Sequence, residues 1–530
     1  MPTLDWIGKD KVINHHNDVP YKVLERKYSY DEDGEHKDDI HSENMIIHGD
    51  NLEALKSLLP QYEGKIKCIY IDPPYNTGNE GWIYNDNVND PKIKKWLGEV
   101  VGKEGEDLSR HDKWLCMMYP RLVLLKKLLH PTQGVIFISI DENEFANLKL
   151  MCNEIFNISN FVISIAWQKR YSRENRGAIG DSHEYILIYA TNPDVFKETR
   201  NYLPLTEKQL KAYSNPDNDP RGLWQSVSLL AQGYRPNQMY EIVAPNGKVH
   251  LPPEGNCWKV VQSEYERALA EGRVTFGSDG NGVPRRKQFL NESKGLVPWS
   301  WWPFDEVGHT DEAKKEMKAI LGNITAFDTP KPVRLIERIV HIATKKDSVI
   351  LDSFAGSGTT AHAVLNMNKK DGGNRKFILV EMGDYADTIT AERVKRVIDG
   401  YGEGKNAVDG TGGNFSYYEL GSPLFLKDGT INNDIDTAEI RKYIWYTETN
   451  GLEYAENEQE KYYLGSHNDT AYYFYYEKDK ATILDYSFLA TVNVKNQAYI
   501  IYADSCTLSD IDLQKWNITF KKIPRDIEHI

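Results

Sequence analysis

The residues best suited to chemistry follow a short apolar run, Ile69–Ile71. This run is rich in β-branched and aromatic side chains, which predicts a buried strand, and Asp72-Pro73-Pro74-Tyr75 comes directly after it. Two adjacent prolines fix φ at about −65°, remove two N–H donors and end the strand. Their carbonyls can still accept hydrogen bonds. Asp72 adds a charged acceptor and Tyr75 adds a flat ring. Two acceptors beside a stacking surface suit a planar substrate that carries an amino group.

A plainer interpretation of Asp72 is a capping residue in a proline turn. A bare Asp-Pro-Pro would normally mean no more than that. Tyr75 and the strand before the turn favour the functional interpretation.

A second constellation lies in Ser348–Thr360, where an apolar strand ends in Asp352 and Phe-Ala-Gly-Ser-Gly-Thr follows. The glycines allow a ligand to approach the backbone closely, and the next helix offers N–H groups to an anion. No lysine follows as in a Walker A loop, and the third glycine of a dinucleotide fingerprint is absent. The next strand, Phe377–Val380, ends in Glu381, and a carboxylate there suits two ribose hydroxyls.

The elements around these residues alternate between strand and helix. Met45–Gly49 predicts a strand, and the leucines of Leu52–Leu59 recur at helical spacing before the strand that carries Asp72. Strand, helix and strand in so short a span predict a parallel βαβ unit. Asp50 ends the first strand, at the edge where open α/β sheets bind ligands, and a helix N-cap is an equally good interpretation of it.

Bulk composition limits the function classes. A chain of 530 residues predicts two or three domains, and its net charge of −14 requires any nucleic-acid contact to rely on local cations or a partner. The five cysteines are scattered, which argues against zinc or a disulfide framework and favours a reducing cytoplasm. No cysteine follows a proline, so a nucleophile for cytosine C5 methylation is missing. We find neither a signal peptide nor an apolar run long enough for a membrane.

The Asp72–Tyr75 motif resembles the catalytic motif of DNA amino-methyltransferases. Its flanks, Ile69–Gly78 as a whole, resemble more narrowly the modification (Mod) subunit of type III restriction–modification systems. The chain order of catalytic motif, inserted segment and cofactor loop matches the permuted β class of that family. The resemblance covers most of residues 1–400 and is weakest in the inserted segment. It implies an α/β, Rossmann-like methyltransferase sheet in circularly permuted order.

The resemblance, together with shifts in composition, also implies a division into domains. Near Ala190 the strand–helix rhythm gives way to Pro, Gly, Asn and large aromatics, and Gly410–Gly413 reads as a flexible link. We therefore expect the catalytic half at 1–190, a β-rich target-recognition domain at 191–324, the cofactor half at 325–402, and a small α/β domain with subunit contacts at 403–530.

Site residues follow from the motifs that match the family. The catalytic residues implied are Asp72, Pro73, Pro74 and Tyr75. Cofactor contacts are implied at the adenine ring, the ribose, the methionine end and the pocket flank, and no metal is implied. The residues for these contacts are Asp50, Lys331, Asp352, Phe354, Ala355, Gly356, Ser357, Gly358, Thr359 and Glu381.

The resemblance implies methyl transfer from S-adenosylmethionine to adenine N6 of a base flipped out of duplex DNA. It also implies a homodimer and a separate restriction subunit with helicase and nuclease activity, in the cytoplasm and without a membrane. N4 methylation of cytosine stays open, although an acid before Pro-Pro leans towards adenine. A catalytically silent DNA-specificity subunit and RNA methylation are further alternatives.

Three polar segments have plainer expectations. Residues 1–42 predict a surface arm with limited structure, and the long loop Asn76–Arg110 predicts a lid or a binding loop. The basic segment Lys169–Arg176 predicts either a solvated surface or a phosphate contact.

Overall fold

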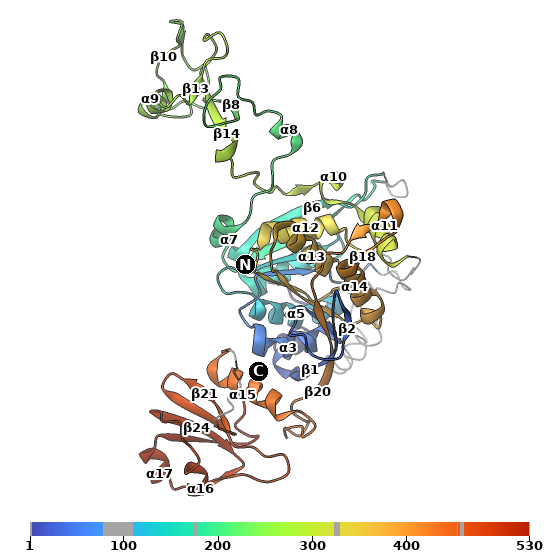
Figure 1. Ribbon diagram of the computed structural model, residues 1–530. Helices are drawn as coiled ribbons and strands as arrows, with labels where there is room; N and C mark the ends of the chain where they lie inside the picture. Colours follow the sequence, from blue (N-terminus) through green and yellow to red (C-terminus); the bar gives the residue numbers. More distant parts are fainter. Residues whose placement is uncertain are drawn as a thin grey trace. The chain divides into compact units, whose positions relative to one another are not determined.

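The computed structural model describes residues 3–77, 110–173, 178–322, 329–452, 454–455 and 460–528. The chain forms two compact units, one of Met1–Asn201 with Trp299–Ile530 and one of Tyr202–Pro298 (Figure 1). The smaller unit lies inside the segment 191–324 expected from composition, and both ends of that segment belong to the larger unit. Among the residues described, no helix is both long and apolar enough to span a membrane.

The larger unit is built on a sheet of eleven strands. In spatial order these are β15 (Trp301–Trp302), β6 (Phe161–Gln168), β7 (His183–Ala190), β5 (Val135–Ile140), β4 (Cys68–Ile71), β16 (Val349–Asp352), β17 (Lys376–Glu381), β3 (Met45–His48), β20 (Phe415–Pro423), β1 (Lys22–Asp31) and β2 (Gly34–His36). The six strands from β5 to β20 in this order are mutually parallel. Strand β7 runs antiparallel to both β5 and β6.

Strand order confirms the permuted α/β fold. β3 and β4 are consecutive in the chain, yet β16 and β17 lie between them in the sheet. The carboxyl ends of parallel strands meet at one edge, so this order brings Asp72, Asp352 and Glu381 to the same edge. The two constellations predicted from sequence are therefore neighbours in space.

Helices cover both faces of this sheet. On one face α3 (Asn51–Tyr62) and α5 (Arg110–Leu128) pack into a cluster with alternate strand residues such as Ile69 and Ile138. The strand residues of opposite parity, such as Phe137 and Leu379, are buried too, as expected of a parallel sheet covered twice. Three helices on either side of the second constellation in the chain are α12 (Val333–Ala343), α13 (Thr359–Asp371) and α14 (Glu392–Asp399). They pack in sequence, α12 on α13 and α13 on α14, and are seen together in Figure 1.

The surface arm predicted for residues 1–42 is wrong. Lys9–Val12 and His15–Asp18 are short helices (α1 and α2), and β1 pairs with β20 inside the main sheet. Tyr28 stacks on Tyr417 across this pair, with ring centroids 5.0 Å apart. The many charged residues of β1 point outward and conceal the alternation that marks a strand.

The segment after residue 402 contributes to two sheets. Strand β20 joins the main sheet, so this sheet takes a strand from beyond the expected boundary at 402. Further on, a second sheet has the order β21 (Tyr463–His467), β22 (Thr470–Phe474), β24 (Ala498–Ala503) and β26 (Ile518–Lys522). Helix α15 (Thr437–Thr449) packs on this second sheet.

The smaller unit has a β-rich framework. Strands β13 (Val274–Thr275), β14 (Arg285–Phe289) and β8 (Trp224–Ser228) form an antiparallel sheet. Helix α9 (Gln262–Ala270) contributes Tyr265 to a separate core with Trp258. This unit thus has a hydrophobic core of its own.

Candidate active site

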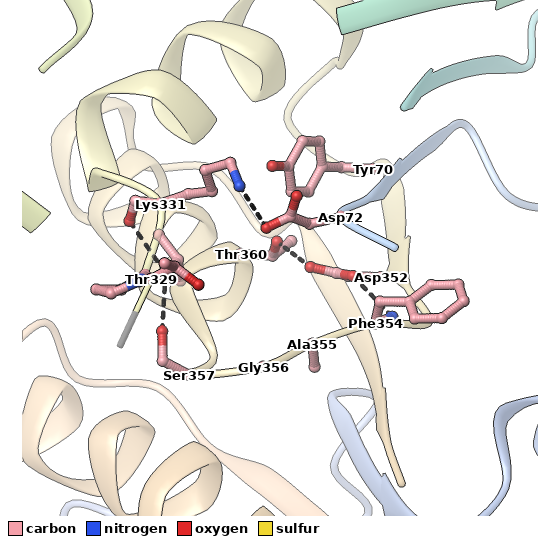
Figure 2. A pocket seen from close by; sticks show the side chains of 12 residues that line it. Tyr70, Asp72, Thr329, Lys331, Asp352, Phe354, Ala355, Gly356, Ser357 and Thr360 are labelled. Atoms are coloured by element: carbon pink, nitrogen blue, oxygen red, sulfur yellow. Dashed lines mark hydrogen bonds and ion pairs between the residues drawn. The ribbon is translucent and has the colours of Figure 1, made fainter. Parts of the chain in front are cut away.

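Both sequence constellations line one cavity at the carboxyl edge of the sheet. Figure 2 shows Lys331 and Asp72 pointing toward each other, with Asp352 beside them at the end of the adjacent strand. The lining residues are Tyr70, Asp72, Thr329, Pro330, Lys331, Asp352, Phe354, Ala355, Gly356, Ser357, Thr359 and Thr360. Seven of the cofactor residues predicted from sequence are in this set, which we call the cofactor cavity.

Asp72 is held by two of its neighbours. Its Oδ2 lies 2.6 Å from Lys331 Nζ, and its Oδ1 accepts a hydrogen bond of 2.9 Å from the Tyr75 hydroxyl. Burial raises the pKa of the Asp72 carboxyl, and the Lys331 ammonium opposes that shift. The double proline stops β4 so that this carboxylate leaves the sheet and faces the cavity.

Tyr75 is pinned at its hydroxyl. The hydroxyl oxygen is 2.9 Å from Asp72 Oδ1 and 3.0 Å from Glu184 Oε2. Lys331 Nζ lies 5.0 Å from the centre of its ring, a cation–π arrangement. Burial raises the pKa of Tyr75 well above its usual range. The role of this ring in stacking on a base stays a prediction.

The two prolines have different surroundings. The Pro74 carbonyl accepts a hydrogen bond of 2.6 Å from Nε1 of the buried Trp114, a residue of α5. This bond ties the turn to the helix beneath it and gives Pro74 a structural role. Pro73 lines the second cavity described below, where its predicted role as an acceptor can be tested.

A second cavity of about 340 Å³ opens on the other side of Asp72. It shares Asp72, Thr329, Pro330 and Lys331 with the cofactor cavity. Its volume is within the usual range for small-ligand pockets. The remaining lining residues are Pro73, Tyr75, Thr77, Asp141, Trp167, Lys169, Arg170, Asp181, Glu184 and Thr310. We call it the substrate cavity.

Several lining residues of the substrate cavity were not predicted, and Lys169 was misjudged. Rather than being solvated, its side chain is only 12% exposed, and its Nζ lies 2.8 Å from Asp181 and 3.3 Å from Glu184. Burial alone would lower the pKa of Lys169, but these two carboxylates outweigh it and raise the pKa. Glu184 is the second residue of the antiparallel strand β7. This position could have revealed it, because an antiparallel strand starts where its parallel neighbours end.

The glycine loop has the backbone geometry of a ligand cradle. Gly356 and Gly358 have backbone φ angles of 52° and 78°, which residues other than glycine rarely adopt. A Cβ on Gly358 would lie 3.1 Å from the Thr390 carbonyl oxygen. The Glu381 carboxylate accepts backbone N–H bonds from Gly356 at 2.7 Å and Gly383 at 2.8 Å, so it joins the loop to the end of β17.

Arg393 supports this loop from behind. It is fully buried on α14, and its Nη1 donates to Ser357 Oγ at 2.9 Å and Thr359 Oγ1 at 2.8 Å. Burial lowers the pKa of Arg393 to about 10. Nothing in the local sequence marks this residue, because an arginine on a helix normally faces solvent.

Asp352 accepts hydrogen bonds from the Phe354 backbone N–H at 3.1 Å and from the Thr360 hydroxyl. Burial raises the pKa of Asp352 to about 7 in spite of these bonds, and the charges of Asp72 and Glu381 add to the rise. A carboxyl group at this position is thus partly protonated near neutral pH.

We expect Asp352→Asn to remove a pH-dependent loss of stability. The pKa of Asp352 is about 7 in the folded protein, above its ordinary value of about 3.9. The contribution of protonated Asp352 to the free energy of unfolding is therefore fully present below about pH 3.9 and is lost as the pH rises through 7. The variant lacks this loss. Its melting temperature relative to wild type should therefore rise between pH 5 and pH 8. A difference that stays constant over that interval would contradict the assignment.

Asp50 caps the N-terminus of helix α3, which is one of the two roles predicted for it from sequence. Its Oδ1 accepts from the Leu52 N–H at 2.8 Å at the start of α3, and Arg121 Nη2 lies 3.2 Å from its Oδ2. Asp50 follows His48, the register partner of Glu381, by two residues. It thus lies near the ribose-binding candidate, and its contact with a cofactor stays a prediction. Most of the predicted lid or binding loop, residues 78–109, lies outside the described residues.

Comparisons with known proteins agree with this geometry. A family model described as DNA methylase matches residues 66–392. The StyLTI Mod subunit of a Salmonella typhimurium type III restriction–modification enzyme is 36% identical, over 74% of this chain and 62% of that protein. The EcoPI Mod subunit of Escherichia phage P1 is 34% identical, over 72% of this chain and 63% of that protein. The chain therefore matches less than two thirds of the length of these two relatives.

A shorter relative is matched more completely. The type II methyltransferase M.KpnI of Klebsiella pneumoniae is 31% identical, over 64% of this chain and 80% of that protein. The family model extends over both constellations, from the strand of Asp72 to Glu392, the first residue of α14. The resemblance predicted from sequence is thereby confirmed, and the chain belongs to the N6/N4 DNA methylase family.

Proposed function

We propose that this protein transfers a methyl group from S-adenosylmethionine to adenine N6 of a base flipped out of duplex DNA. The observation that carries the proposal is the sharing of Asp72 and Lys331 by the cofactor cavity and the substrate cavity. A methyl donor and an amino acceptor in these two cavities would meet at Asp72. The similarity to type III Mod subunits supports the same activity.

The donor residues present suit this cofactor. When bound, S-adenosylmethionine supplies an electrophilic methyl group on a sulfonium. Glu381 would hold the ribose hydroxyls, as its place at the end of β17 suggests. The glycine loop Phe354–Thr359 would take the methionine end, where its positive-φ glycines allow close approach. Lys331 and Asp352 line the cofactor cavity together with five residues of this loop, whereas Glu381 is not among its lining residues and reaches it through the Gly356 N–H.

On the substrate side, flipping the base costs a few kcal/mol and exposes its amino group. Asp72 and the Pro73 carbonyl would accept the two amino hydrogens, which draws the nitrogen lone pair out of ring conjugation. Tyr75 and Trp167 supply aromatic surface in the cavity. The rate gain then comes from positioning and from electrostatics arranged before the reaction.

The test is a tritiated S-adenosylmethionine assay on unmethylated duplex DNA, followed by nucleoside analysis. Label in N6-methyladenine is the expected result. Label in N4-methylcytosine would keep the mechanism and overturn the base. Cofactor binding without label in DNA, and with label in RNA, would overturn the duplex substrate.

We also propose the assembly that the relatives' names suggest. The protein would act as the modification subunit of a type III system, as a homodimer in the cytoplasm with a separate restriction subunit. Free cysteines at all five positions suit that compartment. Size measurement with and without DNA tests the dimer.

We propose the unit Tyr202–Pro298 as the target-recognition domain. Along β14, Lys287 and Phe289 are buried, while Arg286 and Gln288 face outward. Gln288 pairs with Gln225 of β8, whose Nε2 donates to its Oε1 at 3.1 Å. Arginine and glutamine are side chains that read guanine and adenine edges, so this face of the sheet suits base contact.

We expect Gln288→Ala to weaken specific DNA binding by about 5- to 150-fold, which corresponds to the loss of one base contact of about 1–3 kcal/mol. Binding to a random duplex should change little. Gln262→Ala, an exposed glutamine on α9, is the matched control and should bind both duplexes as wild type does. Equal weakening on both duplexes would mean a backbone contact instead.

A further inference from the structure

The Tyr75 hydroxyl stands between two carboxylates. Its oxygen lies 2.9 Å from Asp72 Oδ1 and 3.0 Å from Glu184 Oε2. A hydroxyl carries one proton, so it can donate to only one of these oxygens at a time. With both carboxylates ionised, one of the two short contacts lacks a proton. The three groups therefore form a chain with room for one more proton.

Two ammonium groups neighbour this chain. Lys331 Nζ is 2.6 Å from Asp72 Oδ2 and 3.8 Å from Glu184 Oε2, and Lys169 Nζ is 3.3 Å from Glu184 Oε1. Lys169 Nζ also lies 2.8 Å from Asp181, so two ammonium groups face three carboxylates and the cluster can accept one more proton. The ionisable groups around Glu184 come from several elements. They are Tyr70, Asp72, Tyr75, Asp141, Lys169, Asp181 and Lys331.

Glu184 is also placed to return a proton to water. Its own side chain is only 12% exposed, but it shares Lys169 with Asp181, a residue of the same cavity that is 54% exposed and so lies on a route to water. Asp72, in contrast, belongs to both cavities and would be covered by donor and base during the reaction. An exit for a proton from Asp72 therefore has to pass another group.

We propose that Asp72, Tyr75 and Glu184 form a relay that carries away the proton released by methylation. This inference rests on the proposed function. Glu184 is the terminal acceptor of the relay, and Tyr75 is its middle member in addition to its ring contact with the base.

The step balances as follows. The amine nitrogen forms a bond to the methyl carbon, the carbon–sulfur bond breaks, and its electron pair stays on sulfur. The nitrogen then carries a positive charge and loses one N–H proton to Asp72, keeping the electron pair of that bond. Asp72 passes this proton to the Tyr75 oxygen while the Tyr75 hydroxyl proton moves to Glu184. The relay ends with Asp72 ionised, Tyr75 neutral and Glu184 protonated, and both short contacts then hold a proton.

The test compares Glu184→Gln and Tyr75→Phe with wild type in single-turnover methylation between pH 6 and pH 9. Gln keeps the size of Glu184 and a hydrogen-bonding oxygen but takes no proton, and Phe keeps the ring. We expect each variant to lose about 100-fold in rate at neutral pH, the scale of general base catalysis. The loss should shrink as pH rises, because hydroxide then removes the proton directly, and S-adenosylmethionine affinity should stay within about twofold.

The double variant decides between a relay and separate roles. Members of one relay fail together, so the double variant should be no slower than either single variant by more than about twofold. Independent structural roles would multiply to about 10⁴-fold instead. Glu142→Gln is the matched control, since Glu142 follows β5 nearby, is 65% exposed and accepts from Tyr185 at 2.5 Å. It should keep the wild-type rate and pH profile.

Each outcome is informative. If Glu184→Gln fails to fold, Tyr75→Phe still tests the relay. Wild-type rate and pH dependence in Tyr75→Phe would overturn it, and so would a loss that does not vary with pH. If wild type itself transfers no methyl group to any nucleic acid, the proposed function fails, and that result is separate from a failure of the relay.

Discussion

Asp72→Ala is expected to lower the single-turnover rate of methyl transfer by about 10³-fold. The variant loses the carboxylate that faces both cavities and would accept an amino hydrogen. S-adenosylmethionine should still bind within about tenfold of wild type, because Glu381 and the glycine loop keep their mutual contacts. Rapid-quench kinetics gives the rate, and calorimetry gives the affinity.

The control for this variant is Asp194→Ala, an exposed acid in the first turn of α7 (Pro193–Thr199). It should methylate as wild type does. Normal turnover by Asp72→Ala would remove Asp72 from the mechanism. Loss of cofactor binding together with methylation would instead assign Asp72 to the cofactor site.

Arg393→Leu is expected to cost about 3 kcal/mol of unfolding free energy, because the shorter side chain leaves a cavity and removes hydrogen bonds to Ser357 and Thr359. Those two hydroxyls belong to the glycine loop, so cofactor affinity should fall about tenfold as the loop loses its support. Urea unfolding and calorimetry measure the two effects.

Arg396→Leu on the same helix is the matched control. Arg396 is 39% exposed, pairs with Glu392 one turn away and donates to the Ile320 carbonyl at 2.8 Å, so its loss should cost only about 1 kcal/mol. Equal destabilisation by both variants would mean that the buried contacts of Arg393 contribute no more to the free energy of unfolding than the exposed contacts of Arg396. Unchanged cofactor affinity in Arg393→Leu would show that the loop holds its shape without it.

The strand ends that carry the acids could be predicted from sequence, because buried parallel strands are continuous apolar runs and the residue after each run faces the ligand edge. Asp72, Asp352 and Glu381 were found this way. Glu184 was missed since it lies at the start of its strand and not after its end, and the antiparallel direction that brings this start to the ligand edge is set by pairing with β5. Lys169 was misjudged because its partners Asp181 and Glu184 arrive from across a hairpin.

The domain bounds expected from composition differ from the compact units of the structure. The compact unit Tyr202–Pro298 is shorter than the segment 191–324, because β15 returns to pair with β6 and composition does not reveal such a pairing. Likewise β1 and β20 pair with each other in the main sheet although they lie far apart in the chain. Their charged or polar outward faces read as surface, whereas their register is fixed by contacts separated by almost 400 residues.

The interleaved strand order also governs how the chain must be assembled. A nascent polypeptide that stops before Val349 holds β3 and β4 but lacks β16 and β17, the two strands that separate them. Each of the two then presents an open hydrogen-bonding edge, a surface that pairs readily with other chains. Contacts so distant in sequence form slowly, which prolongs that exposure. Until the second half emerges from the ribosome, the sheet is not continuous and the proposed methylation site is incomplete. Synthesis itself therefore delays the onset of activity.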